Sequence, residues 1–231
     1  MPYSEALQAL ISERQEQFCL DIANIRHQDW RQIFGNDHPV FLEIGCGKGE
    51  FLSTYPALHP EWNFLGFEVR LKRINLILRK LSPELQSNVR LVTMKVGSNL
   101  RDYVCPASID GIFIQHPDPW PKRKHAKHRL IQTDFIATMH DLLRPRGFVY
   151  ISTDSITYLD WTLDCFKKHE GFKLHADRLL RDHPQLVTQL ETFYDKEQMR
   201  LGYQTKHLFF DRLDHYPMKE IDGDEDETQT Q

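Results

Sequence analysis

The sequence predicts an α/β fold with a mostly parallel, seven-stranded sheet that carries helices on both faces. From Val40 onward, short apolar segments alternate with longer segments of helical pattern. This alternation favours parallel strands joined by right-handed crossovers. A glycine-rich turn directly after the first apolar segment is a second indication, because open parallel sheets bind ligands at the carboxyl ends of their strands.

The expected elements follow one another along the chain. The expected strands are Val40–Ile44, Phe64–Phe67, Val89–Met94, Ile109–Gln115, Phe148–Thr153, Phe172–Ala176 and Thr205–Arg212. The expected helices are Gly49–Leu58, Val69–Leu81, Ile131–Leu142 and Ser155–Lys168. We expect one domain over residues 1–219, with an N-terminal helical arm over about residues 1–37, and an acidic, disordered tail over 220–231.

Composition favours a soluble globular protein of the cytoplasm. Of the 231 residues, 40% are hydrophobic and 27% are charged, and no apolar stretch approaches the length of a membrane-spanning helix. The first residues have neither the basic nor the apolar region of a secretory signal. Four cysteines lie far apart without a CxxC pair, so we expect reduced thiols and neither a zinc site nor a redox pair.

Charge is unevenly distributed along the chain. The net charge is −4, but residues 220–231 hold six acids and no base, so residues 1–219 alone carry +2. Within that remainder, 122–129 reads KRKHAKHR, with five permanent cations and two histidines in eight positions. The net charge therefore does not exclude a nucleic-acid partner.

The glycine-rich turn reads FLEIGCGKGE over residues 41–50. Gly45, Gly47 and Gly49 permit a tight turn and close approach of a ligand to the backbone. The spacing is GxGxG and not the dinucleotide pattern GxGxxG, although such a turn also occurs without a ligand. Glu43 precedes it inside the expected strand, where a carboxylate suits a ligand that carries an ammonium or sulfonium group.

Glu68 ends the next expected strand, about 20 residues past the turn, which suits an acid that binds both hydroxyls of a ribose. The alternative is an exposed acid at a strand end. Together, the glycine turn and Glu68 resemble motifs I and II of the class I S-adenosylmethionine methyltransferases, over about residues 40–155. The resemblance implies their Rossmann-like fold and S-adenosylmethionine as the cofactor.

The segment IQHPDPWPK, residues 114–122, lies at the end of the fourth expected strand. Its prolines give a stiff loop that exposes Asp118 and Trp120 with little conformational freedom to lose on binding. An acid and an aromatic ring next to cations suit a nucleobase on a phosphate backbone. The alternative is a rigid packed turn followed by a solvated helix face.

Three motifs narrow the resemblance to one family. DPWPK with its basic run, STDS at 152–155 with Tyr158, and ETFYD at 191–195 resemble the tRNA (guanine-N7)-methyltransferases, over about residues 38–212. The resemblance implies methylation of a guanine in the variable loop of tRNA. It also implies donor contacts from Glu43, Glu68 and Asp118. The implied contacts to tRNA or its guanine come from Lys122, Asp154, Thr192, Phe193, Tyr194 and Asp195.

Two positions depart from the family pattern. Where the family has an acid or Asn followed by Ala, this chain has Gly97 and Ser98, so a backbone group, Ser98 or Asn99 is expected to face the adenine. Where the family has Thr-Lys-Tyr-Glu or Thr-Lys-Phe-Glu, residues 192–195 read TFYD. These departures affect the expected contacts and not the expected reaction.

The reaction itself indicates the roles of the side chains. Guanine N7 has a lone pair and no proton, so alignment replaces general-base catalysis and no metal is required. Asp118 is the expected catalytic group, since a carboxylate stabilises the positive charge that develops on the purine. Asp154, Asp195 and Thr192 are expected to hold the guanine, and Lys122 and the cations after it to contact phosphates.

For His116, packing and function are equally expected. His125 and His128 are expected to be ordinary surface residues.

Other interpretations of the sequence remain open. One is a class I methyltransferase of a small molecule or a protein, and another is a non-catalytic RNA-binding subunit with a relic donor site. A nicotinamide dehydrogenase fits the glycine spacing less well. We expect a monomer or a homodimer without a membrane or metal partner.

Overall fold

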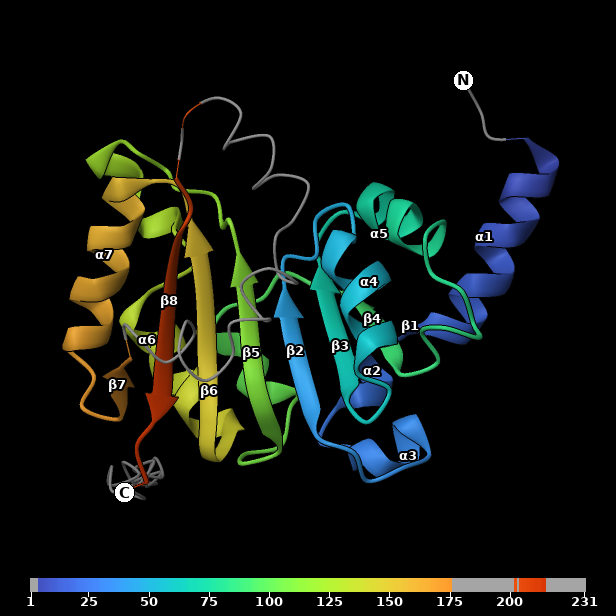
Figure 1. Ribbon diagram of the computed structural model, residues 1–231, viewed down its shortest axis with the longest axis horizontal. Coiled ribbons are helices and arrows are strands. Elements are labelled where there is room, and N and C mark those ends of the chain that lie inside the picture. The colour runs from blue at the N-terminus through green and yellow to red at the C-terminus, as the bar shows by residue number, and fades with distance from the viewer. Residues whose placement is uncertain (1–3, 176–201, 203, 215–231) are drawn as a thin grey trace, which may run out of the picture.

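The computed structural model describes residues 4–175, 202 and 204–214 (Figure 1). Its strands are β1 (Cys19–Leu20), β2 (Val40–Ile44), β3 (Asn63–Glu68), β4 (Val89–Thr93), β5 (Ile109–Gln115), β6 (Leu143–Thr153), β7 (Phe172–Leu174) and β8 (Lys206–Arg212). Its α-helices are α1 (Glu5–Phe18), α2 (Ile22–Ile25), α3 (Trp30–Phe34), α4 (Glu50–Leu58), α5 (Leu71–Leu78), α6 (Thr133–Leu142) and α7 (Ile156–Lys167). Two 3₁₀ helices are η1 (Ser98–Asp102) and η2 (Arg123–His128).

The strands form one sheet in the order β1-β4-β3-β2-β5-β6-β8-β7. Strands β1 to β6 pair in parallel, and β8 pairs antiparallel with both β6 and β7. The chain builds outward from β2 through β3 to β4, then returns to the other side of β2 with β5 and β6. The order therefore reverses between β2 and β5, and their carboxyl ends, at the upper edge of the sheet in Figure 1, are the place where a ligand is expected.

Helices cover both faces of the sheet, as predicted (Figure 1). One face buries an aromatic cluster that includes Phe41, Phe64 and Phe113 under α1, α4 and α5. The other face buries aliphatic side chains such as Ile112 and Ile114 under α6 and α7. All five residues of β2 are buried, which explains why four of them are apolar and only Glu43 is charged.

The predicted count of seven strands is wrong, because the described sheet has eight. The extra strand β1 lies in the segment that we expected to be a helical arm, and its two residues pair with Leu91 and Val92 of β4. A strand of two residues shows no periodicity that a sequence pattern could reveal. The arm otherwise forms α1, α2 and α3. Ala176, the last residue of the sixth expected strand, and the acidic tail lie outside the described residues.

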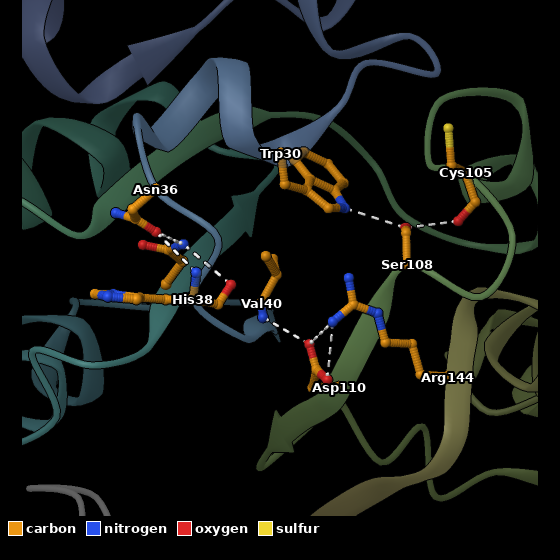
Figure 2. A network of polar contacts seen from close by, with 9 residues as sticks. Trp30, Asn36, His38, Val40, Cys105, Ser108, Asp110 and Arg144 are labelled. Atoms are coloured by element: carbon orange, nitrogen blue, oxygen red, sulfur yellow. Dashed lines mark hydrogen bonds and ion pairs between the residues drawn. The ribbon is translucent and has the colours of Figure 1, made fainter.

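Polar contacts at the amino ends of the strands link β2, β5 and β6 to one another and to Trp30 of the N-terminal segment (Figure 2). The carboxylate of Asp110 accepts a hydrogen bond from the Val40 amide at 2.8 Å and pairs with Arg144 at 3.2 Å. The indole of Trp30 donates to the hydroxyl of Ser108 at 3.1 Å. A cavity of about 470 Å³ lies at this amino edge and is lined partly by these side chains.

Candidate functional site

A cavity of about 260 Å³ lies at the carboxyl ends of the central strands. The segments after four strands line it: Gly45 after β2, Glu68 at the end of β3, Val96 after β4, and the segment Gln115–Asp118 at the end of β5. The cavity at the amino edge is larger, but parallel sheets present their ligand-binding loops at the carboxyl edge. The smaller cavity also holds the predicted acids Glu68 and Asp118, and we take it as the candidate site.

The glycine-rich turn begins at Gly45, which lines this cavity. Gly45 and Gly47 adopt φ values of +82° and +57°, which side chains other than glycine rarely tolerate. The amides of Gly45 and Cys46 donate to the Phe67 carbonyl at 2.8 and 3.2 Å, so the turn is held against β3. The turn therefore has the glycine-dependent conformation that the sequence predicts.

Glu68 lies directly beside the turn and is only 2% exposed. Its carboxylate accepts hydrogen bonds from the amides of Gly47 at 3.1 Å and Arg70 at 2.9 Å. It also pairs with the guanidinium of Arg73 at 3.4 Å. The alternative of an exposed acid at a strand end is therefore wrong. Donors hold this buried charge, and each carboxylate oxygen has lone pairs for more than one of them.

Glu43 is 3% exposed and lies in β2, one residue before the cavity-lining Ile44. Burial in the protein interior raises the pKa of this carboxyl group to about 8. Its Oε2 atom has no hydrogen-bond partner among the described residues. A buried carboxyl oxygen without a donor fits a cationic ligand at this end of the sheet, although the side chain is not among the residues that line the cavity.

We expect Glu43 to make stability fall as the pH rises. Its folded-state pKa of about 8 exceeds the ordinary value of 4.5, so the folded state binds the proton more tightly than the unfolded state. Between these pH values the folded state holds more protons, and its free energy of unfolding decreases as the pH increases. Thermal unfolding from pH 5 to pH 9 should show this decrease in wild type and a weaker one in Glu43→Gln. Equal slopes would contradict the prediction.

Residues 97–99 begin one position past Val96, which lines the cavity. Gly97 precedes η1, whose first residues are Ser98 and Asn99. The side-chain Nδ2 of Asn99 donates to the Lys95 carbonyl at 3.3 Å. Among the described residues, Met94, Lys95 and Val96 line the cavity at this corner and 97–99 do not. An adenine contact from Gly97, Ser98 or Asn99 stays a prediction.

The loop after β5 brings Asp118 and Trp120 to the cavity. Both residues line it, Asp118 is exposed, and Trp120 is 39% exposed. The loop begins where the His116 amide donates to the Ser152 carbonyl of β6 at 2.9 Å. Trp120 has a φ of +42°, in the left-handed region that a bulky side chain rarely occupies. The structure thus confirms the expected exposure of both side chains.

Two histidines also line the cavity: His116, for which packing and function were equally expected, and His128, which was expected to be an ordinary surface residue. His116 has its Nδ1 atom 3.8 Å from a carboxylate oxygen of Asp154, which links the loop to the segment after β6. The imidazole of His128 lies 5.3 Å from the Trp120 ring, measured between ring centroids. His125 contacts the same ring at 5.7 Å. Sequence reasoning had no signal for these contacts, because they depend on how the loop folds back.

The basic run forms η2 directly after the loop. Lys122 precedes the helix, and the side chains of Lys122, Arg123, Lys124 and Lys127 are exposed. These four cations follow the cavity-lining loop in the chain and are accessible to solvent, and their contacts with phosphates stay a prediction.

For Arg129 the prediction of a phosphate contact is wrong. The sequence groups it with the phosphate-binding cations, but it is only 6% exposed. Its guanidinium donates to the carbonyls of Pro119 and Trp120, each at 3.1 Å. The chain leaves η2 at this residue and turns the side chain inward, which a run of cations does not reveal. Arg129 is not accessible to RNA phosphates.

The predicted substrate residues Thr192, Phe193, Tyr194 and Asp195 lie outside the described residues, and their contacts stay predictions. Asp154 is described. It follows β6, its side chain is 21% exposed, and it faces His116 of the loop.

The strand order, glycine turn and acid at the end of β3 define the fold of the class I methyltransferases. Among solved structures, the aminoglycoside resistance methyltransferase NpmB1 has a TM-score of 0.53 with 14% identity over 80% of this chain and 92% of that one. The 16S rRNA methyltransferase KamB has a TM-score of 0.54 with 12% identity over 80% of this chain and 94% of that one. At this identity the likeness shows the fold alone.

A family model described as "Putative methyltransferase" matches residues 37–208. A tRNA (guanine-N(7)-)-methyltransferase of Lactococcus lactis subsp. cremoris (strain MG1363) is 37% identical over 185 residues, 78% of this chain and 85% of the relative. The enzyme of that name from Geobacillus thermodenitrificans (strain NG80-2) is 32% identical over 181 residues, 78% of this chain and 83% of the relative. The chain belongs to the tRNA (guanine-N(7)-)-methyltransferase family. None of the helices in the described part of the chain is long and apolar enough to cross a membrane.

Proposed function

We propose that this protein transfers a methyl group from S-adenosylmethionine to N7 of a guanine in tRNA, in the variable loop as the family resemblance implies. One observation carries the proposal. Asp118 and Trp120, on a proline-stiffened loop, line the same cavity as Gly45 and Glu68, and exposed cations follow that loop. A tRNA substrate also favours the cytoplasm as the site of action.

The donor side of the site is the half that lies over β2, β3 and β4. Glu68 would accept hydrogen bonds from the ribose hydroxyls, since it is a buried, negatively charged acceptor beside the glycine turn. The backbone of Lys95 and Val96 and the following residues 97–99 would face the adenine. Because Glu43 is mostly protonated at neutral pH, it would balance the positive charge of the donor once donor binding displaces that proton. When bound, S-adenosylmethionine supplies an electrophilic methyl group on a sulfonium.

The acceptor side is the half that lies over β5 and β6. Guanine N7 needs no base to remove a proton, so the side chains must orient the purine and stabilise the charge that it gains. Asp118 would provide that negative charge, and the exposed face of Trp120 would pack against the base. Asp154, together with Thr192 and Asp195, would accept hydrogen bonds from the guanine N1–H and amino group, with Phe193 and Tyr194 beside them.

Methyl transfer from labelled S-adenosylmethionine tests this function against its competitors. We expect label in unmodified tRNA, and none in duplex DNA or in a protein mixture. Label in protein or in a small molecule would support a different substrate. Donor binding without any transfer would indicate an inactive site, and absence of donor binding in calorimetry would indicate a relic.

We expect the exposed cations of η2 to determine tRNA affinity. Each cation that contacts a phosphate releases counterions, so removing one lowers the slope of log affinity against log salt by about 0.7–0.9. Lys124→Ala with Lys127→Ala should therefore weaken tRNA binding and flatten its salt dependence, while donor affinity stays unchanged. Lys122 is left intact because it adjoins the loop.

Filter binding of tRNA at several salt concentrations measures the slope. The matched control is Lys167→Ala with Lys168→Ala, which removes two exposed cations at the far end of α7. A salt slope in the η2 variant that equals the slope of this control would show that η2 is an ordinary solvated surface.

A further inference from the structure

We propose that Arg129 is a positioning residue. It holds the loop after β5, residues 116–122, in the conformation that presents Asp118 and Trp120. The proposal rests on the proposed function, because it assigns Arg129 a role only through Asp118. It changes the role of Arg129 from a phosphate contact on the surface to an internal support beneath the loop.

The loop has few means of holding itself. Pro117, Pro119 and Pro121 occupy three of the five positions 117–121, and proline has no backbone N–H to donate. The last backbone contact at its start is the His116 amide on the Ser152 carbonyl. Trp120 then adopts a positive φ, a conformation that persists only where the surroundings impose it. Hydrogen-bond donors from outside the loop must therefore fix its carbonyls.

Arg129 supplies those donors. Its Nε atom donates to the Pro119 carbonyl and its Nη2 atom to the Trp120 carbonyl, both at 3.1 Å. The two carbonyls belong to consecutive residues, directly after Asp118. A planar guanidinium can reach both in one rigid geometry, and a lysine ammonium on its flexible stem cannot reproduce it.

Helix α7 in turn fixes Arg129. The guanidinium lies over the Trp161 ring, 4.8 Å from the centroid. The Trp161 indole donates to the Ile131 carbonyl at 2.7 Å, and Gln132 donates to the Arg129 carbonyl at 3.0 Å. The side chain and backbone of Arg129 are thus both held, and Arg129 couples the loop to Trp161 of α7.

Arg129→Lys tests the proposal, because it preserves the charge and most of the stem. We expect turnover to fall at least ten-fold, while tRNA affinity and its salt dependence stay within two-fold of wild type. Peptides covering residues 116–122 should also exchange their amide hydrogens faster. In Arg129→Ala, millimolar guanidinium should partly restore turnover, and equal concentrations of sodium chloride should not.

Arg90→Lys is the matched control. Arg90 likewise donates to backbone carbonyls, those of Ser87 and Val89 at 2.8 and 2.7 Å, and its guanidinium lies 5.3 Å from the Phe34 ring centroid. It lies at the start of β4, at the opposite edge of the sheet. Its replacement should lower the melting temperature and leave turnover and exchange of the loop unchanged.

The outcomes separate the alternatives. The proposal would be overturned if Arg129→Lys kept both the turnover of wild type and the wild-type rate of amide hydrogen exchange in residues 116–122. A weaker, less salt-dependent tRNA affinity with intact turnover would also overturn it and restore Arg129 as a phosphate contact. If wild-type protein methylates no tRNA, the proposed function fails, and the exchange of residues 116–122 still decides whether Arg129 holds the loop.

Discussion

Asp118→Ala should nearly abolish methyl transfer to tRNA while the protein stays folded. Asp118 is the exposed acid of the proline loop and lines the cavity that we assign to the donor and the guanine. Removing one electrostatic stabiliser of a transition state typically costs about 10²–10³ in turnover. Asp118→Asn should show nearly the same loss, since it keeps the shape of the side chain and removes the charge.

Single-turnover rates with saturating donor and tRNA measure this effect. Asp164→Asn is the matched control, because Asp164 is an exposed acid on α7 away from the cavity. Turnover above about a tenth of wild type, a loss below about 1.4 kcal/mol of barrier, would remove Asp118 from the central role.

Glu68→Gln should weaken donor binding by about ten- to hundred-fold and leave tRNA binding unchanged. A hydrogen bond to a charged group contributes about 1.5–3 kcal/mol, and the amide side chain lacks that charge. The buried carboxylate also accepts from the Gly47 amide at 3.1 Å, so the variant should loosen the glycine turn that we propose contacts the donor. Both effects act on the donor alone.

Calorimetry with S-adenosylmethionine and filter binding with tRNA measure the two affinities. Glu61→Gln, at the amino end of β3, removes an exposed acid outside the cavity and should change neither. A Glu68→Gln variant with wild-type donor affinity would show that Glu68 does not bind the ribose.

Much of the fold could be predicted because β2, β3 and β5 are largely buried and their sequences VFLEI, NFLGFE and IDGIFIQ are therefore mostly apolar. The turn was predictable from its glycines, whose positive φ values other residues rarely adopt. The two residues of β1 were not predictable, since they pair with β4 through tertiary contacts and show no pattern of their own. Local sequence indicates a strand, and it does not indicate which short segment completes a sheet edge.

The candidate site likewise has residues that the sequence predicted and residues that it did not. Glu68 and Asp118 line the cavity where the sequence placed them, because Glu68 ends β3 and Asp118 follows β5 at the same edge of the sheet. Glu43 is buried beside that cavity and does not line it. His116, His128 and Arg129 acquire their contacts from the path of the proline loop, which a linear pattern does not specify.

The position of the methyl group on tRNA tests the central claim most directly. Unmodified tRNA would be incubated with labelled S-adenosylmethionine and wild-type protein, digested to nucleosides, and separated by chromatography with mass detection. We expect all label to appear in 7-methylguanosine, and Asp118→Ala to yield almost none. Label in any other nucleoside, or equal label from the variant, would contradict it.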